Sequence, residues 1–250
     1  MNLKPLISVI ITYYRKKEYI KKTLNSIHKQ SYKNYELIFV YDDENKSELK
    51  FIKNLISVFD KKKLIVNNKN LGVAKSRNRA LKFCNGKYIS FIDSDDTWSK
   101  NKLKKQLSFM IFKKLEFSFT SYSVIDGYNN IISYRKVNKD GKYDDLIKSN
   151  YIGLSTVMFQ KKLLKYMKFP NLKTQEDFAL WLKLLKKGYK LTHMKQNLSS
   201  WRKTENSLSS HPIQKISDAF KLYYKIENKN LTLSIYSVLV LVYNKIKKLT

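Results

Sequence analysis

The first ninety residues alternate short apolar runs with segments of helical periodicity, and this alternation restricts the fold more than any other feature. The apolar runs have the length and composition of buried strands, and they cover residues 6–11, 35–41, 64–66 and 88–92. Apolar side chains recur at helical spacing between them, in 18–29, 47–59 (capped by Ser47) and 73–84. Such alternation is typical of a parallel sheet with helices on both faces, so the sequence predicts an α/β fold.

Acidic residues are scarce, yet half of them are clustered. The chain has 20 Asp and Glu against 50 Lys and Arg. Ten of the acids form the clusters Asp42–Glu44, Asp93–Asp96, Asp144–Asp145 and Glu176–Asp177. Two clusters follow predicted strands directly, and ligands bind beyond the carboxyl ends of parallel strands. We therefore expect these two clusters to line one crevice, where a divalent cation would relieve the repulsion between carboxylates.

The net charge of +30 raises nucleic-acid binding as an alternative function. No basic stretch with interleaved aromatic residues forms a recognisable nucleic-acid module, so we expect no nucleic-acid partner. A basic surface would still favour an anionic membrane. The apolar run after Met1 is too short for a signal peptide, and no segment reaches the roughly 18–20 apolar residues of a membrane span.

The second half of the chain is less regular. We expect strands at 117–125, 131–134 and 156–159, and a helix at 175–187 whose first turn holds Glu176 and Asp177. We divide the chain into a domain at 1–212 and a helical tail at 213–250. The tail contains a strongly apolar stretch, 231–243, followed by lysines. Docking on the domain, pairing in a homodimer and contact with the membrane interface remain open for it.

Several motifs stand in the order and spacing found in family 2 glycosyltransferases. They are Ser8–Tyr14, Leu24–Ile27 with Gln30–Tyr32, Tyr35–Asp43, Asn70–Asn78, Gly86–Asp96, Ser155–Met158 and Glu176–Trp181. This resemblance covers roughly residues 5–210. It implies a GT-A fold, which is a Rossmann-like, mostly parallel sheet flanked by helices.

The resemblance also implies an activity. Such an enzyme moves a sugar, with inversion, from a nucleotide diphosphate sugar to a hydroxyl of a glycan or lipid-linked acceptor in surface polysaccharide synthesis. A UDP-sugar is the favoured donor, and Mg²⁺ or Mn²⁺ is the expected cofactor. The expected location is cytoplasmic, with peripheral contact on the inner face of the cell membrane.

On the nucleotide side, the resemblance assigns roles to five residues. Asp43, with Asp42 beside it, resembles the carboxylate that recognises the base. Thr12 and Tyr13 would lie against that base. Arg77 resembles the basic residue near the nucleotide.

On the reaction side, Asp93 and Asp95 resemble a DxD motif. Asp93 would face the ribose, and Asp95 would face the metal and the diphosphate. Asp177 resembles the general base, which would activate the acceptor hydroxyl by roughly 10²–10⁴-fold. Arg202, in the pair Trp201–Arg202 that is followed by Ser207–Ser209, is similar to a late basic motif facing the diphosphate.

Each cluster also has a structural alternative. Asp42–Asp43 could form a solvated turn, Asp93–Asp96 could cap a helix starting near Ser99, and Glu176–Asp177 could serve only the helix dipole. We expect Asp144–Asp145 to be a solvated helix start. A nucleotidyltransferase on a similar sheet is a further alternative, but it would need a glycine-rich loop after the first strand, and residues 12–17 contain no glycine.

Overall fold

The alternation of the first ninety residues folds as predicted in the computed structural model, which describes residues 4–204 and 211–247. The strands are β1 (Ile7–Tyr13), β2 (Tyr35–Tyr41), β3 (Lys62–Val66), β4 (Tyr88–Asp93), β5 (Thr97–Trp98), β6 (Phe117–Ile125), β7 (Ile131–Arg135), β8 (Met158–Gln160) and β9 (Thr192–Arg202). The α-helices are α1 (Lys17–His28), α2 (Lys46–Ile56), α3 (Val73–Leu81), α4 (Lys102–Phe112), α5 (Tyr143–Leu146), α6 (Glu176–Lys186), α7 (Pro212–Lys221) and α8 (Leu231–Ile246). Short 3₁₀ segments cover Leu154–Thr156 and Lys161–Tyr166, and a π-helical turn covers Leu222–Ile226.

One sheet joins these strands in the order β3-β2-β1-β4-β8-β6-β9-β5, with β7 added on β6. The strands β1 to β4 are mutually parallel, whereas β8 runs antiparallel to both β4 and β6. Thr12 of β1 pairs with Val40 of β2 on one side and with Asp93 of β4 on the other. The carboxyl ends of these three strands therefore meet at one edge of the sheet, as the sequence predicted.

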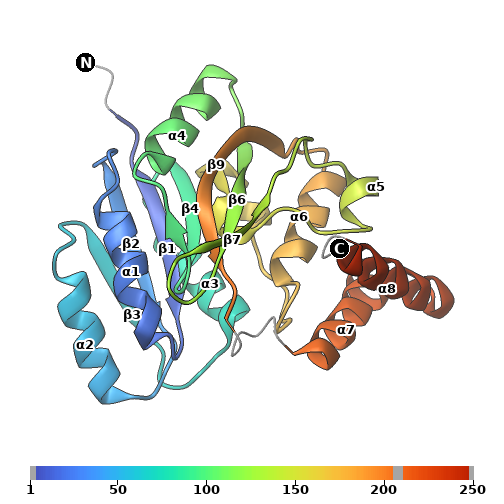
Figure 1. Cartoon of the computed structure of the whole chain (residues 1–250), viewed down its shortest axis with the longest axis horizontal. Coiled ribbons are helices and arrows are strands. Elements are labelled where there is room, and N and C mark those ends of the chain that lie inside the picture. Colours follow the sequence, from blue (N-terminus) through green and yellow to red (C-terminus); the bar gives the residue numbers. More distant parts are fainter. Residues whose placement is uncertain (1–3, 205–210, 248–250) are drawn as a thin grey trace.

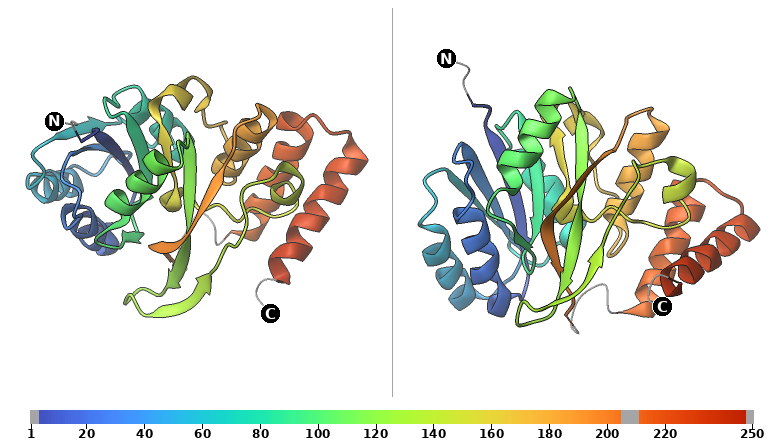
Figure 2. Two further views of the ribbon diagram at one scale, coloured as in Figure 1. Left: turned by 90° about the horizontal axis from the view of Figure 1, so that it is seen from above. Right: turned by 45° about the horizontal axis from the view of Figure 1, so that its top comes forward.

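Helices cover both faces of the parallel half of the sheet (Figures 1 and 2). On one face, α1, α2 and α4 bury side chains such as Ile20, Ile52 and Leu103 in a core with Val9 of β1. On the other face, α3 and α6 pack in a second core that includes Trp181, whose ring contacts Phe117 edge to face. Buried apolar side chains on both faces explain why the strands read as continuous apolar runs.

The connection from α3 to β4 requires a glycine at position 86. A Cβ atom there would lie 2.4 Å from the backbone nitrogen of Ser8. The buried Glu36 fixes the same place, because its carboxylate accepts hydrogen bonds from the Ser8 hydroxyl and from the backbone nitrogens of Asn85 and Gly86. The chain thus passes close under β1 before it enters β4 and reaches the acids at its end.

Some element boundaries differ from the sequence-based predictions. The helix α2 is capped by Asn45, whose side chain accepts from the backbone nitrogens of Ser47 and Glu48, so Ser47 is not the cap. Helix α3 ends at Leu81, three residues before Cys84. Helix α4 starts at Lys102, after Asn101, so the acids at 93–96 do not cap it. The strands β5 and β9 were not predicted.

The helices α7 and α8 pack against the end of the molecule that carries α5 and α6 (Figure 1). Asp218 of α7 accepts hydrogen bonds from the backbone and the hydroxyl of Thr174, and the hydroxyl of Tyr223 donates to the carbonyl of Ile147. The prediction of a separate tail beginning at 213 stays a prediction. Across the described ranges 4–204 and 211–247, no helix has the length and apolar character needed to cross a membrane.

Candidate active site

A buried arginine links two acidic clusters that are far apart in the sequence. The Arg77 guanidinium on α3 donates to Asp93 at the end of β4 over 2.7 Å, and its other terminal nitrogen pairs with Glu176 at the start of α6. Burial opposes the charge of Arg77, but the carboxylates of Asp93, Glu176 and Asp177 oppose its deprotonation, and its pKa is raised. One guanidinium therefore brings acids of the two clusters close together.

Asp177, the predicted general base, has a strongly perturbed pKa. Burial, with the negative charge of Glu176 next in importance, raises its pKa to about 7, although Arg77 acts in the opposite direction. One carboxylate oxygen accepts a hydrogen bond of 2.6 Å from the backbone nitrogen of Phe178. A carboxylate with a pKa near 7 is half deprotonated at neutral pH, which is the state that a general base requires.

The three acids after β4 have different surroundings. Asp93 is partly exposed and paired with Arg77, while Asp95 pairs with the ammonium of Lys16 at 3.1 Å. Asp96 is buried and accepts hydrogen bonds from the Ser155 hydroxyl and the backbone nitrogen of Arg202. Burial raises the pKa of both Asp95 and Asp96, and for Asp95 the charge of Lys16 opposes this. Asp93 and Asp95 thus pair with basic side chains, whereas Asp96 is buried and accepts hydrogen bonds from uncharged groups of the protein.

Ser155 and Tyr122 lie close to these acids, and they were given no role from the sequence. The Ser155 hydroxyl joins Asp96 to the backbone nitrogen of Asp93, and its carbonyl accepts from the indole of Trp98. Burial raises the pKa of Tyr122 on β6 to about 12, and the nearby charges of Asp96 and Asp177 contribute. The Tyr122 hydroxyl therefore lies within electrostatic reach of an acid from each cluster.

The two acids after β2 also differ. Asp42 is buried, and its carboxylate accepts hydrogen bonds from the side chain of Asn67 and the backbone nitrogens of Leu71 and Gly72. Asp42 thereby fixes the turn that leads into α3, where Gly72 has a φ of 85°. Asp43 uses one oxygen to accept from the backbone of Glu44, but its other oxygen is buried without a hydrogen bond, 3.6 Å from Nε of Arg15. Of the pair, Asp43 retains the capacity to bind a ligand.

Thr12 and Tyr13 point to opposite faces of β1, as successive residues of a strand must. Thr12 is partly exposed beside Asp93, its register partner. Tyr13 is fully buried, its ring stacks on Tyr41, and its hydroxyl donates to Glu48. The ring of Tyr13 therefore offers no face to a nucleotide base in this arrangement, whereas Thr12 does face the site.

Arg202 lies at the end of β9 and is 1% exposed. Its guanidinium donates to the carbonyl of Asp95, to the carbonyl of Asp126 and to the side chain of Asn129. These contacts fasten the loop between β6 and β7 to the acid run. Arg202 is thus next to the site, but its donors are engaged by the protein, so its expected contact with the diphosphate gains no support here. Ser207–Ser209, the second part of the same predicted motif, lie outside the described residues.

The remaining acid cluster does not join the site. Asp144 and Asp145 stand in the first turn of the short helix α5, and Asp145 pairs with Lys139 at 2.9 Å. This placement confirms the sequence-based interpretation of a solvated helix start. Asp144 is exposed, which makes it a useful control for the acids of the site.

The charges of this acidic site are suited to a cation. Four carboxylates, those of Asp93, Asp95, Glu176 and Asp177, share the cations Arg77 and Lys16. Such a site would repel a diphosphate unless a cation accompanied it. Across 4–204 and 211–247, no three His, Cys, Asp or Glu side chains form a ready-made metal cage. The donor set fits Mg²⁺ or Mn²⁺ held by one or two carboxylates, with the other ligands supplied by phosphates and water.

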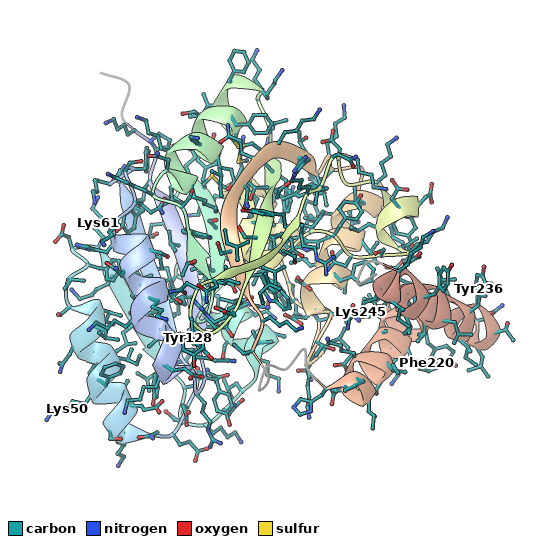
Figure 3. All side chains as sticks on the ribbon, viewed as in Figure 1. Lys50, Lys61, Tyr128, Phe220, Tyr236 and Lys245 are labelled. Carbon is teal, nitrogen blue, oxygen red and sulfur yellow. The ribbon has the colours of Figure 1, made fainter. Side chains whose placement is uncertain are left out.

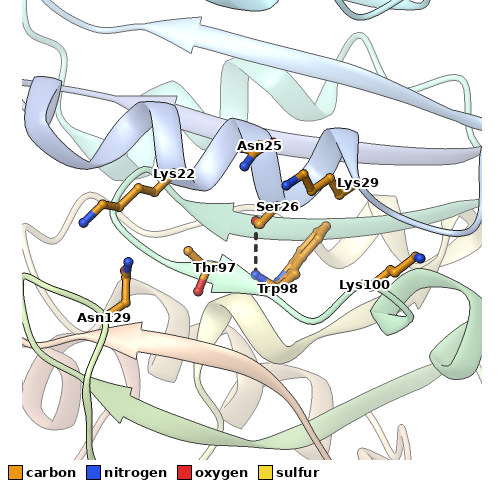
Figure 4. Close-up of a pocket in the computed structure, with 8 residues that line it drawn as sticks. All are labelled: Lys22, Asn25, Ser26, Lys29, Thr97, Trp98, Lys100 and Asn129. Carbon is orange, nitrogen blue, oxygen red and sulfur yellow. Dashed lines mark hydrogen bonds between the residues drawn. The ribbon is translucent and has the colours of Figure 1, made fainter.

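A cavity of about 370 Å³ opens just beyond the acid run, between α1 and the strand β5 (Figure 4). Lys22 and Lys29 from α1 and Lys100 from the segment after β5 line it, and the backbone of Trp98 donates to the hydroxyl of Ser26 at its centre. A larger cavity, of about 1190 Å³, lies beside Tyr88 at the amino end of β4. The larger cavity is thus at the opposite end of β4 from the acids.

Comparison with known proteins supplies independent information. The sequence profile described as "Glycosyl transferase family 2" matches residues 8–171. The chain is 33% identical over 249 residues to TuaG of Bacillus subtilis strain 168, a protein named as a teichuronic acid biosynthesis glycosyltransferase, with 99% of this chain and 98% of TuaG covered. It is 32% identical over 213 residues to WfgD of Escherichia coli, named as a UDP-Glc:alpha-D-GlcNAc-diphosphoundecaprenol beta-1,3-glucosyltransferase, with coverage of 84% and 82%.

Among solved structures, TarS from S. aureus in complex with UDP-GlcNAc superimposes with a TM-score of 0.72. The superposition covers 90% of this chain and 67% of the TarS chain at 22% identity. At this identity the likeness concerns the fold, and it agrees with the mixed sheet and flanking helices described above.

Proposed function

Because this chain belongs to glycosyl transferase family 2, we propose that it transfers a sugar, with inversion, from a UDP-sugar to a lipid-linked acceptor in surface polysaccharide synthesis. The observation that supports this most strongly is the bridge of Arg77 between Asp93 and Glu176. This bridge supports the proposal because it holds Asp93, on the proposed donor side, close to Glu176, the neighbour of the candidate base Asp177. Nucleic-acid binding and nucleotidyl transfer find no comparable support.

We propose that the sugar donor binds at the edge of the sheet where β1, β2 and β4 end. One oxygen of Asp43 is buried and accepts no hydrogen bond, although Arg15 lies 3.6 Å away, so it is a suitable acceptor for an N–H group of a nucleotide base. Asp42 holds the turn beneath it, and Thr12 faces the same edge. The assignment of a UDP-sugar is supported by WfgD, whose name states UDP-Glc as donor, and by the UDP-GlcNAc bound to TarS.

For the departing diphosphate we propose that Asp95, with Asp93 beside it, holds Mg²⁺ or Mn²⁺. When bound, such an ion stabilises the charge that develops on the diphosphate as a Lewis acid. The Lys16 ammonium, which now lies 3.1 Å from the Asp95 carboxylate, would be displaced by a metal bound to Asp95. Lys16 would be free to approach the phosphates, and Arg77 would keep Asp93 and Glu176 in place.

We assign the general base to Asp177. With a pKa of about 7, its carboxylate can remove the proton of the acceptor hydroxyl as the new bond forms. Glu176, held by Arg77, raises that pKa by its negative charge. Attack by the activated hydroxyl from the side of the sugar opposite to the diphosphate would invert the anomeric centre.

For the acceptor we propose a lipid-linked sugar, by analogy with the diphosphoundecaprenol substrate in the name of WfgD. The cavity after β5 adjoins the acid run, and its lysines Lys22, Lys29 and Lys100 are suited to the phosphates of such an acceptor. We accordingly place the protein in the cytoplasm, on the inner face of the cell membrane, where a lipid-linked acceptor would be reached.

A panel of nucleotide sugars tested by thermal shift, with and without Mn²⁺, examines the proposal directly. The correct donor should raise the melting temperature by mass action, and more strongly with the metal present. In Asp95→Ala the metal-dependent part of the shift should vanish. In Asp144→Ala, which removes an exposed carboxylate elsewhere, it should remain. A panel without any metal-dependent shift, or an unchanged shift in Asp95→Ala, would contradict the assignment.

A further inference from the structure

The helix α8 carries its apolar side chains on its outer side. Leu231, Ile235, Leu239 and Ile246 are 57%, 48%, 62% and 57% exposed. Tyr236, Val242 and Tyr243 are exposed as well. Their spacing places these side chains on one continuous stripe of the helix. A helix that merely covers a soluble domain would show the reverse arrangement, with its apolar stripe inward.

The side of α8 that faces the protein is polar by comparison. Its buried residues are Ser234, Ser237 and Val238, and the Ser234 hydroxyl donates back to the carbonyl of Asn230 in its own helix. Because these serines are small, α8 can approach the body of the protein closely. Most of its larger side chains take no part in that contact. Leu241 packs against the core, but the exposed leucines, isoleucines and tyrosines of α8 remain available for another surface. Tyr236 lies at the outer margin of the molecule (Figure 3).

The exposed charge of α7, α8 and the turn between them is positive. The two acids, Asp218 and Glu227, are buried and engaged, Asp218 by Thr174 and Glu227 by Lys186 and Tyr143. The charged side chains most exposed to solvent in this region are Lys221 of α7, Lys225 of the turn, Lys245 of α8 and Lys247 just after it. Apolar side chains and tyrosines accompanied by lysines suit the boundary of an anionic bilayer, where acyl chains meet phosphates.

We propose that this outer face of α7 and α8 lies on an anionic lipid bilayer, with the stripe of α8 inserted at the acyl boundary and the lysines at the lipid phosphates. A second copy of the chain fits less well, because each copy has a net charge of +30 and would bring the same lysines to the contact. The inference deepens the proposed function and rests on it in one respect, since a lipid-linked acceptor would lie in the same bilayer.

Flotation with vesicles tests this surface without any substrate. The full chain should float with vesicles of phosphatidylcholine and phosphatidylglycerol, less with phosphatidylcholine alone, and less at high salt. The double variant Ile235→Ser/Leu239→Ser should lower the partition coefficient by about tenfold or more. The control Phe112→Ser removes a side chain that is 79% exposed on α4, away from this face, and should float like the unaltered protein.

Three results would overturn the inference. The unaltered protein could fail to float with anionic vesicles, the double variant could float equally well, or the unaltered protein could form a dimer that the double variant dissociates. Because the altered side chains are exposed, the double variant should keep its melting temperature and its donor-induced shift. If no nucleotide sugar produced such a shift in any variant while flotation behaved as expected, the proposed function would fail and the membrane surface would stand.

Discussion

The acids after β2 and the acids after β4 occupy equivalent places in the sheet but are treated differently by the protein. Each group contains one buried carboxylate that the protein satisfies completely, Asp42 in the first and Asp96 in the second. After β2, Asp43 has an exposed arginine 3.6 Å away. After β4, Asp93 and Asp95 each hold a cation at hydrogen-bonding distance.

This difference separates carboxylates that stabilise the sheet edge through hydrogen bonds from carboxylates that are available to a ligand. An acid whose oxygens accept from backbone nitrogens cannot be freed without disrupting the fold. An acid paired with a lysine or arginine side chain can exchange that partner for a metal or a substrate. Substitutions at neighbouring positions should therefore affect stability in one case and catalysis in the other.

The largest effect is expected at Asp95. In Asp95→Asn the sugar-transfer kcat/KM should fall about a thousandfold, because the carboxylate proposed to hold the metal is lost and a bound metal contributes several kcal/mol to the transition state. The free energy of unfolding should change little, since burial already raises the pKa of Asp95 and disfavours its charged form. Steady-state kinetics and urea unfolding measure the two quantities, with Asp144→Asn as control. If the free energy of unfolding of Asp95→Asn fell by as much as its activation free energy rose, the distinction between structural and ligand-binding acids would be contradicted.

Asp96, its neighbour, should behave in the opposite way. Asp96→Ala leaves the Ser155 hydroxyl and the backbone nitrogen of Arg202 without their buried acceptor. We expect the free energy of unfolding to fall by about 2–4 kcal/mol. Urea unfolding measures this loss, and the mutation Ser155→Ala should reproduce part of it. Unchanged stability in Asp96→Ala would assign Asp96 to the ligand-binding acids instead.

Asp42 and Asp43, which follow β2, should show the same contrast between stability and ligand binding, with smaller effects. Asp42→Ala should lower the free energy of unfolding by about 2 kcal/mol, because three donors from Asn67, Leu71 and Gly72 lose their acceptor. Asp43→Asn should keep that free energy but weaken donor binding about tenfold, through loss of one charge-assisted hydrogen bond. Chemical unfolding and donor titration by calorimetry separate the two. Equal effects of the two substitutions on either quantity would contradict the comparison.

The smallest effect is expected at Lys16. Its ammonium competes with a metal for Asp95, and both side chains are partly exposed, so the pair is worth about 1 kcal/mol at most. Lys16→Gln should therefore tighten Mn²⁺ binding in the absence of nucleotide by up to about fivefold. Electron paramagnetic resonance of free Mn²⁺ measures this affinity without any turnover. Weaker Mn²⁺ binding in the variant would show that Lys16 supports the metal site rather than competing for it.

Much of the sheet edge at the ends of β1, β2 and β4 could be predicted, because the sequence shows both the strand ends and the clustered acids. The resemblance assigned Arg77 to the site, but Arg15 and Lys16 could not be singled out, since they are two among 50 basic residues. Their place directly after β1 was the available signal, because that strand ends at the same edge as β2 and β4. The burial of Tyr13 also follows from strand alternation, which places its side chain on the core face together with Val9 and Ile11.

The strand β9 and the lysine of α4 illustrate what hydrophobic patterns miss. β9 lies beside β6 and is joined to it partly by polar contacts, such as the Asn197 amide donating to Ser123, so its sequence does not read as a buried strand. Lys102 is fully buried, its amine lies 4.0 Å from the centre of the Trp98 ring, and burial holds its pKa well below the usual range. In both places polar side chains are satisfied by tertiary contacts that no local pattern specifies.

The most direct test of Asp177 as the general base is the pH dependence of kcat/KM for sugar transfer, measured in the unaltered protein and in Asp177→Asn between about pH 5 and 9. The base acts when deprotonated, and the pKa of Asp177 is raised to about 7, so kcat/KM should rise roughly tenfold per pH unit up to about pH 7 and then level off. In Asp177→Asn the activity should be at least a hundredfold lower and should lose that rise. A rise through the same pH range that persists in Asp177→Asn would contradict the account, because the base would then lie elsewhere.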